Sequence, residues 1–127
     1  MLKWGDEVIQ MEVRMRGSVA VIDGGENLFA DAASTLDLIA TIGYVHGAAR
    51  IAAPRESVAP AFFRLATGLA GEVLQKFVNY HVKLALFGDF SIYQSGPLRD
   101  FMRESNAGRD IFFVPTEDEA VERLSKA

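Results

Sequence analysis

The longest apolar pattern in the chain covers residues 60–81, PAFFRLATGLAGEVLQKFVNYH. Its apolar residues come in adjacent pairs spaced three, then four, four and four residues apart, which places them in one wide stripe on a helix. Glu72 and Lys76 lie one turn apart on the opposite face, in the order that favours an ion pair. We therefore expect a central helix over this range, with Phe77 in the core.

Gly68 and Gly71 interrupt the polar face of this predicted helix, where each glycine costs about 1 kcal/mol relative to alanine. One interpretation is that these small residues let another backbone approach closely, most simply that of a second copy in a homodimer. The other is that Thr67 and Gly68 break the stretch, with Thr67 capping the helix proper and residues 60–66 forming a separate turn. The second interpretation explains Gly68 but not Gly71, so both stay open.

Short apolar runs alternate with helical patterns along the rest of the chain. The predicted strands cover residues 8–14, 18–23, 50–53, 82–87 and 111–114. A turn at residues 15–17 joins the first two strands into a hairpin. Residues 82–87 are almost continuously apolar, as is typical of a parallel strand that is buried on both faces.

Capping residues mark the other helices. Asp31 is placed to begin a helix over residues 32–45 that Gly47 closes. Its predicted buried side carries Leu36, Ile39, Ala40 and Gly43. Ser95 caps the next helix, which residues 106–108 stop, and residues 116–119 are a capping box for the last one.

The resulting order of elements is β-β-α-β-α-β-α-β-α. Strands that alternate with helices at this spacing predict right-handed crossovers and a mostly parallel sheet, with an antiparallel hairpin at the N-terminus. The sequence has no internal repeat or linker. We expect residues 1–127 to form a single α/β domain.

Composition excludes several classes of function. The net charge of −4, without a cluster of basic residues, argues against binding to nucleic acid or to an anionic membrane. The absence of cysteine excludes disulfides and zinc–thiolate sites. Residues 1–17 lack the apolar core of a signal peptide, and no apolar run approaches the roughly 20 residues of a membrane span. We expect a cytoplasmic protein.

Polar residues follow several predicted strands, where α/β proteins bind their ligands. This strand-end crevice would collect Arg55, Asp89, Ser91 and Thr116. Asp89, directly after a buried strand, is the best candidate for a functional carboxylate. The favoured alternative is that its side chain satisfies the amides of its own turn.

No catalytic constellation is recognisable in the sequence. His46 lies at the end of a predicted helix, and His81 lies on or beside the central stripe, where packing at the core or its boundary is expected. Neither histidine has a carboxylate neighbour at metal-ligand spacing. We expect no metal, no cofactor and no enzymatic activity.

Four segments resemble an uncharacterised bacterial family, domain of unknown function 4180. They are STLDLIAT at 34–41, FFRLATGLAGEVLQKFVNY at 62–80, LFGDFS at 86–91 and LRDFMRESNAGRDIFFV at 98–114. More remotely, the order of elements is similar to STAS domains, the modules of sulphate transporters and anti-sigma-factor antagonists. In the antagonists, the central helix opens with a D-S-S-G-L-G-like segment whose serine is phosphorylated.

In this chain the aspartate position of that segment is Leu65 and the phosphoacceptor position is Ala66, which leaves Thr67 as the only hydroxyl. The resemblance therefore implies a STAS-like fold without the phosphorylation switch. We expect a binding or regulatory module that recognises a regulatory protein. Its expected surface combines the start of the central helix (Thr67, Gly68, Gly71 and Glu72) with Asp89 and Ser91. The alternative is a small-molecule-binding or catalytic domain that uses the crevice at Arg55, Asp89 and Thr116.

Overall fold

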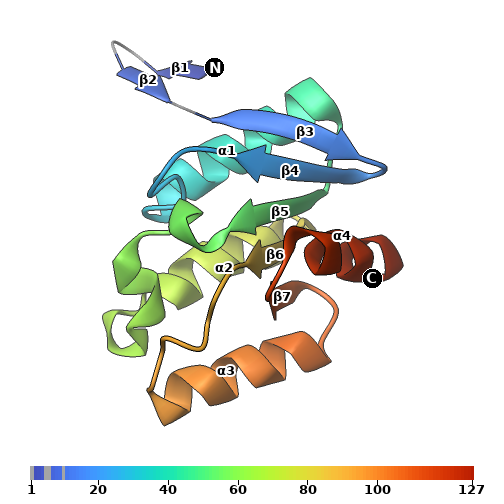
Figure 1. Cartoon of the computed structure of the whole chain (residues 1–127). Coiled ribbons are helices and arrows are strands. Elements are labelled where there is room, and N and C mark those ends of the chain that lie inside the picture. The colour runs from blue at the N-terminus through green and yellow to red at the C-terminus, as the bar shows by residue number, and fades with distance from the viewer. Residues whose placement is uncertain (1, 5–6, 10) are drawn as a thin grey trace.

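The computed structural model describes residues 2–4, 7–9 and 11–127. A five-stranded sheet with the order β3-β4-β5-β6-β7 forms the centre of the protein (Figure 1). Its strands are β3 (Glu12–Arg16), β4 (Val19–Asp23), β5 (Arg50–Pro54), β6 (Lys83–Phe87) and β7 (Ile111–Val114). Strands β4 to β7 are parallel and β3 is antiparallel to β4, which confirms the predicted α/β class and order of elements.

The first predicted strand, over residues 8–14, is wrong in its bounds. Residue 10 lies outside the described residues, and the strand beside β4 is β3. A separate two-stranded sheet pairs β1 (Leu2–Trp4) with β2 (Glu7–Ile9). The turn predicted at 15–17 is also displaced, because Arg16 pairs with Val19 and leaves only Gly17 and Ser18 in the loop. Gly17 has φ +62°, which a two-residue hairpin turn requires and glycine adopts at no steric cost.

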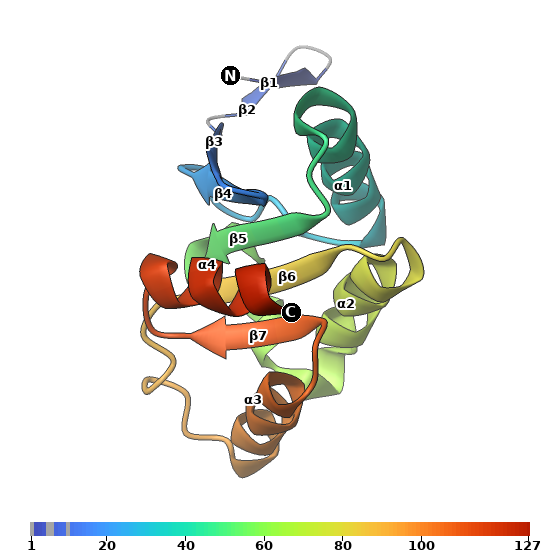
Figure 2. The ribbon, with the colours of Figure 1, turned by 90° about the vertical axis from the view of Figure 1, so that its right-hand side faces the viewer.

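In the described part of the chain, four α-helices cover the two faces of the sheet. They are α1 (Ala32–His46), α2 (Leu69–Asn79), α3 (Gly96–Ala107) and α4 (Glu117–Lys126). Helices α1, α2 and α3 lie on one face, and α4 lies on the other (Figure 2). Each of the first three connects neighbouring parallel strands, so crossovers of one hand place them on the same side. Helix α4 follows the last strand and is free of that constraint.

Strand side chains alternate between two hydrophobic cores. Ala20 and Ile22 face the larger core under α1 to α3, and Val19 and Val21 face the smaller one under α4. Phe77 is completely buried in the larger core, as expected. Its ring meets that of Phe29 edge-on, with 5.5 Å between the centroids.

Residues 60–81 do not form one continuous helix. Pro60–Phe63 and Leu65–Thr67 are short 3₁₀ turns, and only Leu69–Asn79 is α-helical. Gly68, between them, has φ +76°, a conformation that is strained for other residues. The break at Thr67 and Gly68, one of the two interpretations of the sequence, is therefore correct, but the N-cap of the helix is Gly68 and not Thr67.

The packing of His81 was also predicted wrongly. It is exposed and lies beyond the end of α2, with φ +57°. The chain reverses at this point, and the His81 N–H donates to the Val78 carbonyl oxygen (3.2 Å) before the chain enters β6. A position in this reversal lies outside the apolar stripe, because the helical periodicity has already ended.

Helix α1 begins and ends where the caps predict. The Asp31 carboxylate accepts from the Ser34 N–H (2.8 Å), the Ser34 hydroxyl oxygen accepts from the Asp31 N–H (3.1 Å), and Gly47 has φ +63°. The predicted buried side is wrong except at Ile39. Leu36 is half-buried, Ala40 and Gly43 are exposed, and the inward residues are Thr35, Leu38, Ile39 and Ile42. Apolar residues surround much of this helix, so packing against the sheet and α2 decides which ones turn inward.

The last two helices follow the sequence closely. Ser95 caps α3 by accepting from the Leu98 N–H (3.4 Å), and the inward residues Leu98 and Met102 are buried. The Thr116 hydroxyl caps α4 by accepting from the Glu119 N–H (3.2 Å). Among the residues that the structure describes, no helix is long and apolar enough to cross a membrane.

Candidate functional site

The carboxyl ends of the parallel strands bring two connecting segments together. The segment after β5 begins with a 3₁₀ turn over Arg55–Ser57, and residues 88–95 join β6 to α3. The Arg55 guanidinium donates to the Asp89 carbonyl oxygen, which links the two segments directly. An added Cβ at Gly88 would lie 3.1 Å from the Arg55 Cβ, so the backbone directly after β6 approaches Arg55 closely.

Asp89 acts within its own turn. Its Oδ1 accepts from the backbone N–H of Ser91 (2.9 Å) and from the Ser91 hydroxyl. These bonds, with a smaller contribution from the charge of Arg55, hold the pKa of Asp89 below its ordinary value. The structure thus brings together Arg55, Asp89 and Ser91, three of the predicted site residues, and Asp89 satisfies turn amides as the favoured interpretation of the sequence has it.

An aromatic depression lies beside this junction. The Tyr93 ring stacks on Phe63, with 4.5 Å between centroids and an interplanar angle of 20°. Burial raises the pKa of Tyr93 above its ordinary value. The depression has a volume of about 290 Å³, and Ile92 at its rim is 53 % exposed. We call Arg55, Glu56, Phe63, Ile92 and Tyr93, which line it, the strand-end surface.

Phe63, Ile92 and Tyr93 are parts of this surface that the sequence pattern does not indicate. Phe63 was assigned to the stripe of a helix that does not continue through it. An available signal was the apolar and aromatic composition of FSIY at 90–93, in the connection that follows a strand, where loop residues are usually polar. The stacking partner could not be predicted, because it depends on the path of the chain through residues 60–67.

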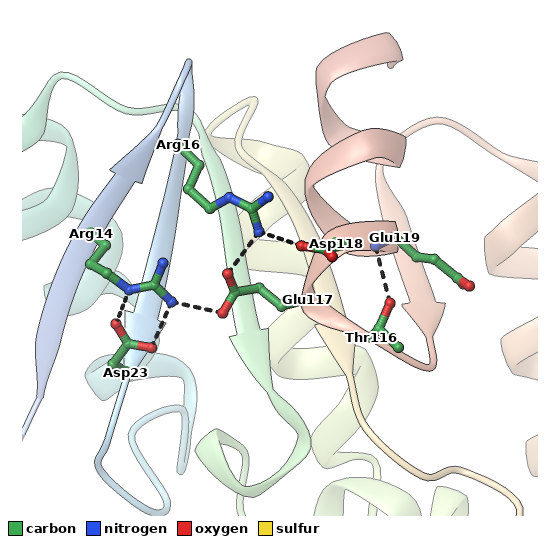
Figure 3. Close-up of polar contacts among 7 residues, drawn as sticks. All are labelled: Arg14, Arg16, Asp23, Thr116, Glu117, Asp118 and Glu119. Atoms are coloured by element: carbon green, nitrogen blue, oxygen red, sulfur yellow. Dashed lines mark hydrogen bonds and ion pairs between the residues drawn. The ribbon is translucent and has the colours of Figure 1, made fainter.

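Thr116, the third residue of the alternative crevice, is occupied as the helix cap of α4. In Figure 3 the Glu119 side chain points away from the start of the helix. The capping box predicted for residues 116–119 is therefore only half formed, by the bond from the Glu119 N–H to the Thr116 hydroxyl. The first turn of α4 instead faces the edge strand β3. Glu117 accepts from Arg14 and from Arg16, each at 2.7 Å.

Glu117 and two further carboxylates form an ion-pair network with Arg14 and Arg16 (Figure 3). Asp23 accepts two hydrogen bonds from Arg14, and Asp118 accepts one from Arg16 (2.9 Å). The bonds from Arg14, and then those from Arg16, lower the pKa of Glu117. Acidic residues in a first helical turn are favourable beside the positive end of the helix dipole. The network therefore links α4 to β3, a structural role that the sequence pattern does not reveal.

The other predicted site residues lie at the start of α2. The Thr67 hydroxyl lies 2.8 Å from the carbonyl oxygens of Ala61 and Arg64 and accepts from the Leu69 N–H (3.2 Å). Gly71 is exposed, and an added Cβ there would meet nothing within 4 Å. Glu72 is exposed in the first turn of the helix. In the described part of the chain, no hydrogen bond joins this group, which includes Gly68, to Asp89 or Ser91.

The two histidines lie at the other end of the strands. His46 ends α1 before β5 begins, and His81 precedes β6, so both are at the amino edge of the parallel strands. Residues 11–127 contain no group of three or more acidic or histidine side chains that could hold a metal ion. The described geometry thus offers a surface with fixed aromatic and polar groups, and it separates the histidines from the strand-end carboxylates.

Comparison with known proteins adds the family of the chain. No curated protein and no solved structure matches it. One family model matches residues 14–124, which include the whole five-stranded sheet except the first two residues of β3, and all four helices except the last two residues of α4. The chain therefore belongs to the family described as a domain of unknown function, DUF4180.

Proposed function

We propose that this chain is a binding module that recognises another protein through the strand-end surface. The observation that carries the proposal is that this surface is held in place before any partner arrives. Arg55 is bonded to the Asp89 carbonyl oxygen, and Tyr93 is stacked on Phe63, which is buried. A surface that is already ordered loses little conformational entropy on binding. Ile92, 53 % exposed beside it, offers an apolar contact that the fold itself does not use.

The shape of the depression favours a protein partner over an enclosed substrate. Its volume of about 290 Å³ lies at the lower limit of ligand pockets, which span roughly 300–1,000 Å³. Glu56, with a side chain 55 % exposed, lies on its rim. One or two protruding side chains of a partner could enter such an open depression, which would leave much of a small ligand exposed to water.

Charge indicates which residues such a partner would present. The rim carries Glu26 and Glu56, and among the described lining residues the one cation is Arg55, whose guanidinium lies 3.4 Å from the Glu56 carboxylate. A partner with an apolar anchor residue beside a lysine or arginine would match both the aromatic floor and the acidic rim. Electrostatic complementarity of this kind supplies specificity more than affinity.

The placement of reactive groups supports a role without catalysis. A general acid or base must reach the reacting atoms within hydrogen-bond distance. The Asp89 carboxylate is engaged by Ser91, and His46 and His81 lie at the opposite end of the strands. The small-molecule-binding or catalytic alternative would use the same depression, so one experiment can separate the two.

STAS-like character and a cytoplasmic location remain parts of the proposal. The order of strands and helices supports the first, and the second stays as expected from the sequence. The Thr67 hydroxyl, the only one near the position that antagonist-type STAS domains phosphorylate, already bonds to its own turn. The proposed module therefore acts by surface recognition without that switch.

Selection of a displayed peptide library on the whole chain tests this function. We expect enriched peptides to combine an apolar residue with a lysine or arginine. Ile92→Asp should weaken their binding at least about tenfold. Val78→Asp is the matched control, because Val78 is 43 % exposed on α2 and does not line the depression, and it should bind as wild type does.

A parallel NMR titration with small aromatic fragments tests the alternative. Fragments that shift the amide signals of Tyr93 and Arg55, together with a library that yields no binder, would favour a small-molecule site. Peptides that bind Ile92→Asp as tightly as wild type would contradict the proposed surface.

A further inference from the structure

The two edge strands of the five-stranded sheet end in different ways. At β7, the Asn106 side chain donates from Nδ2 to the Phe113 carbonyl oxygen (2.9 Å) and accepts at Oδ1 from the Phe113 N–H (2.7 Å). These are the two bonds that a further strand would make. Strand β3 has β4 on one side, and within the described residues no strand pairs with its other side. An edge of this kind is a template for another strand.

A groove with a mixed polar and apolar lining runs beside the open edge. It has a volume of about 470 Å³ and lies between residues 11–13 and the last two turns of α1. Val13 packs against the larger core, so Met15, two residues on, faces the same side of the sheet. Met15 is 42 % exposed, and Val45 in the groove is 59 % exposed. A strand added to β3 would bring side chains to these residues.

The sequence of β3 complements itself in one antiparallel register. When two copies meet about a two-fold axis at Arg14, Glu12 of each lies opposite Arg16 of the other, and Val13 lies opposite Met15. Each match occurs twice, with the charged pairs on the α4 side and the apolar pairs on the α1 side. This register pairs all five residues of the strand, and a shift by one residue places Val13 opposite Arg16.

Arg14 would face itself across the axis, but its charge is compensated within each copy. Two bonds to Asp23 and one to Glu117 hold the guanidinium. Glu12, in contrast, is exposed and has no ion pair among the described residues. Among the described residues, Glu12 is therefore the carboxylate of β3 that is available to the second copy.

We propose that two copies of this chain pair through β3, antiparallel and centred on Arg14, so that their sheets become continuous. This interface differs from the face of α2 that one interpretation of the sequence assigns to a homodimer. It is also separate from the strand-end surface, so the proposal does not depend on the proposed function.

The test measures the mass of the full chain by light scattering and by sedimentation equilibrium. At concentrations of tens of micromolar, a modest interface is populated. We therefore expect wild type in this concentration range to have twice the mass of one chain, which is 13.9 kDa. Glu12→Arg places arginine opposite Arg16 and should weaken dimerisation at least about tenfold. Gly71→Ala, on the face of α2, should keep the mass of wild type.

Charge exchange supplies a second, independent variant. Arg16→Glu alone should also be monomeric, whereas an equimolar mixture of Glu12→Arg and Arg16→Glu chains restores both opposite-charge pairs and should dimerise. Circular dichroism checks that each variant is folded. Arg16 also binds Glu117, so Arg16→Glu could fail to fold. In that case the mass of the Glu12→Arg variant alone tests the proposed dimer. A monomeric wild type, or a folded Glu12→Arg chain that dimerises like wild type, would overturn the proposal.

Discussion

The closing of the β7 edge by one side chain makes Asn106 the most informative position for a stability measurement. Asn106→Ala removes both bonds to the backbone of Phe113, a residue only 5 % exposed. The variant leaves one N–H and one C=O without a partner. Each unpaired buried group costs about 1–3 kcal/mol. Because Asn106 is only half-buried, water can partly replace it, and we expect the lower part of that range for each group.

The expected loss is therefore about 2–4 kcal/mol in the free energy of unfolding, a large share of the roughly 5–15 kcal/mol that holds a domain together. Urea unfolding followed by circular dichroism measures it. Asn79→Ala is the matched control, because Asn79 also lies in the last turn of a helix and is exposed, and among the described residues its side chain bonds only that of Gln75 (2.8 Å). Both substitutions gain the same helix propensity, so their difference isolates the strand edge.

We expect Asn79→Ala to change stability by less than about 0.5 kcal/mol. If Asn106→Ala unfolds at the same urea concentration as this control, water satisfies the Phe113 N–H and C=O groups as well as the Asn106 amide does. That result would also remove the contrast between the two edges on which the pairing of β3 rests.

Three further predictions concern the core, the α2 turn and the ion-pair network. Phe77→Ala should cost about 3–5 kcal/mol in urea unfolding, since the ring is fully buried; a melting temperature within a degree or two of wild type would contradict its burial. Thr67 should carry no phosphate when the protein from its native host is analysed by mass spectrometry, and stoichiometric phosphate there would restore the switch. Arg14 and Arg16 lower the pKa of Glu117 in the folded protein. The stabilisation from these ion pairs is therefore present at pH values above the pKa of Glu117 in the unfolded chain, near 4.5, and is lost as the pH falls through its pKa in the folded protein. The urea midpoint of wild type should thus fall more between pH 6 and about pH 3 than that of Glu117→Gln, and parallel pH profiles would refute this role.

Local chemistry in the sequence was sufficient for the ends of most elements. Asp31, Ser95 and Thr116 cap their helices as predicted, because a cap needs only a short side chain and the amides that follow it. Continuous apolar runs likewise identified β6 and β7 as buried strands. The two glycines were harder to interpret. The left-handed φ of Gly68 explains its presence, whereas Gly71 meets open space and has no conformational requirement.

The candidate site was only partly accessible from the sequence. Arg55, Asp89 and Ser91 follow strands, and the parallel arrangement brought them together as expected. The stacking of Tyr93 on Phe63 was not foreseen, because it depends on a 3₁₀ path through residues that share the apolar spacing of a helix. Apolar spacing reports which residues are buried, and in this segment it did not report the backbone conformation.

The sequence by itself thus determined the class of the fold, the order of its elements and most of their caps, since these depend on interactions within a few residues. The tertiary structure decided what depends on distant partners. Arg14 meets Glu117 across 103 positions, and Asn106, which the sequence marks only as a helix stop, closes the edge of β7. Which strand edge stays open is likewise a property of the assembled sheet, because a strand's own residues do not specify what lies beside it.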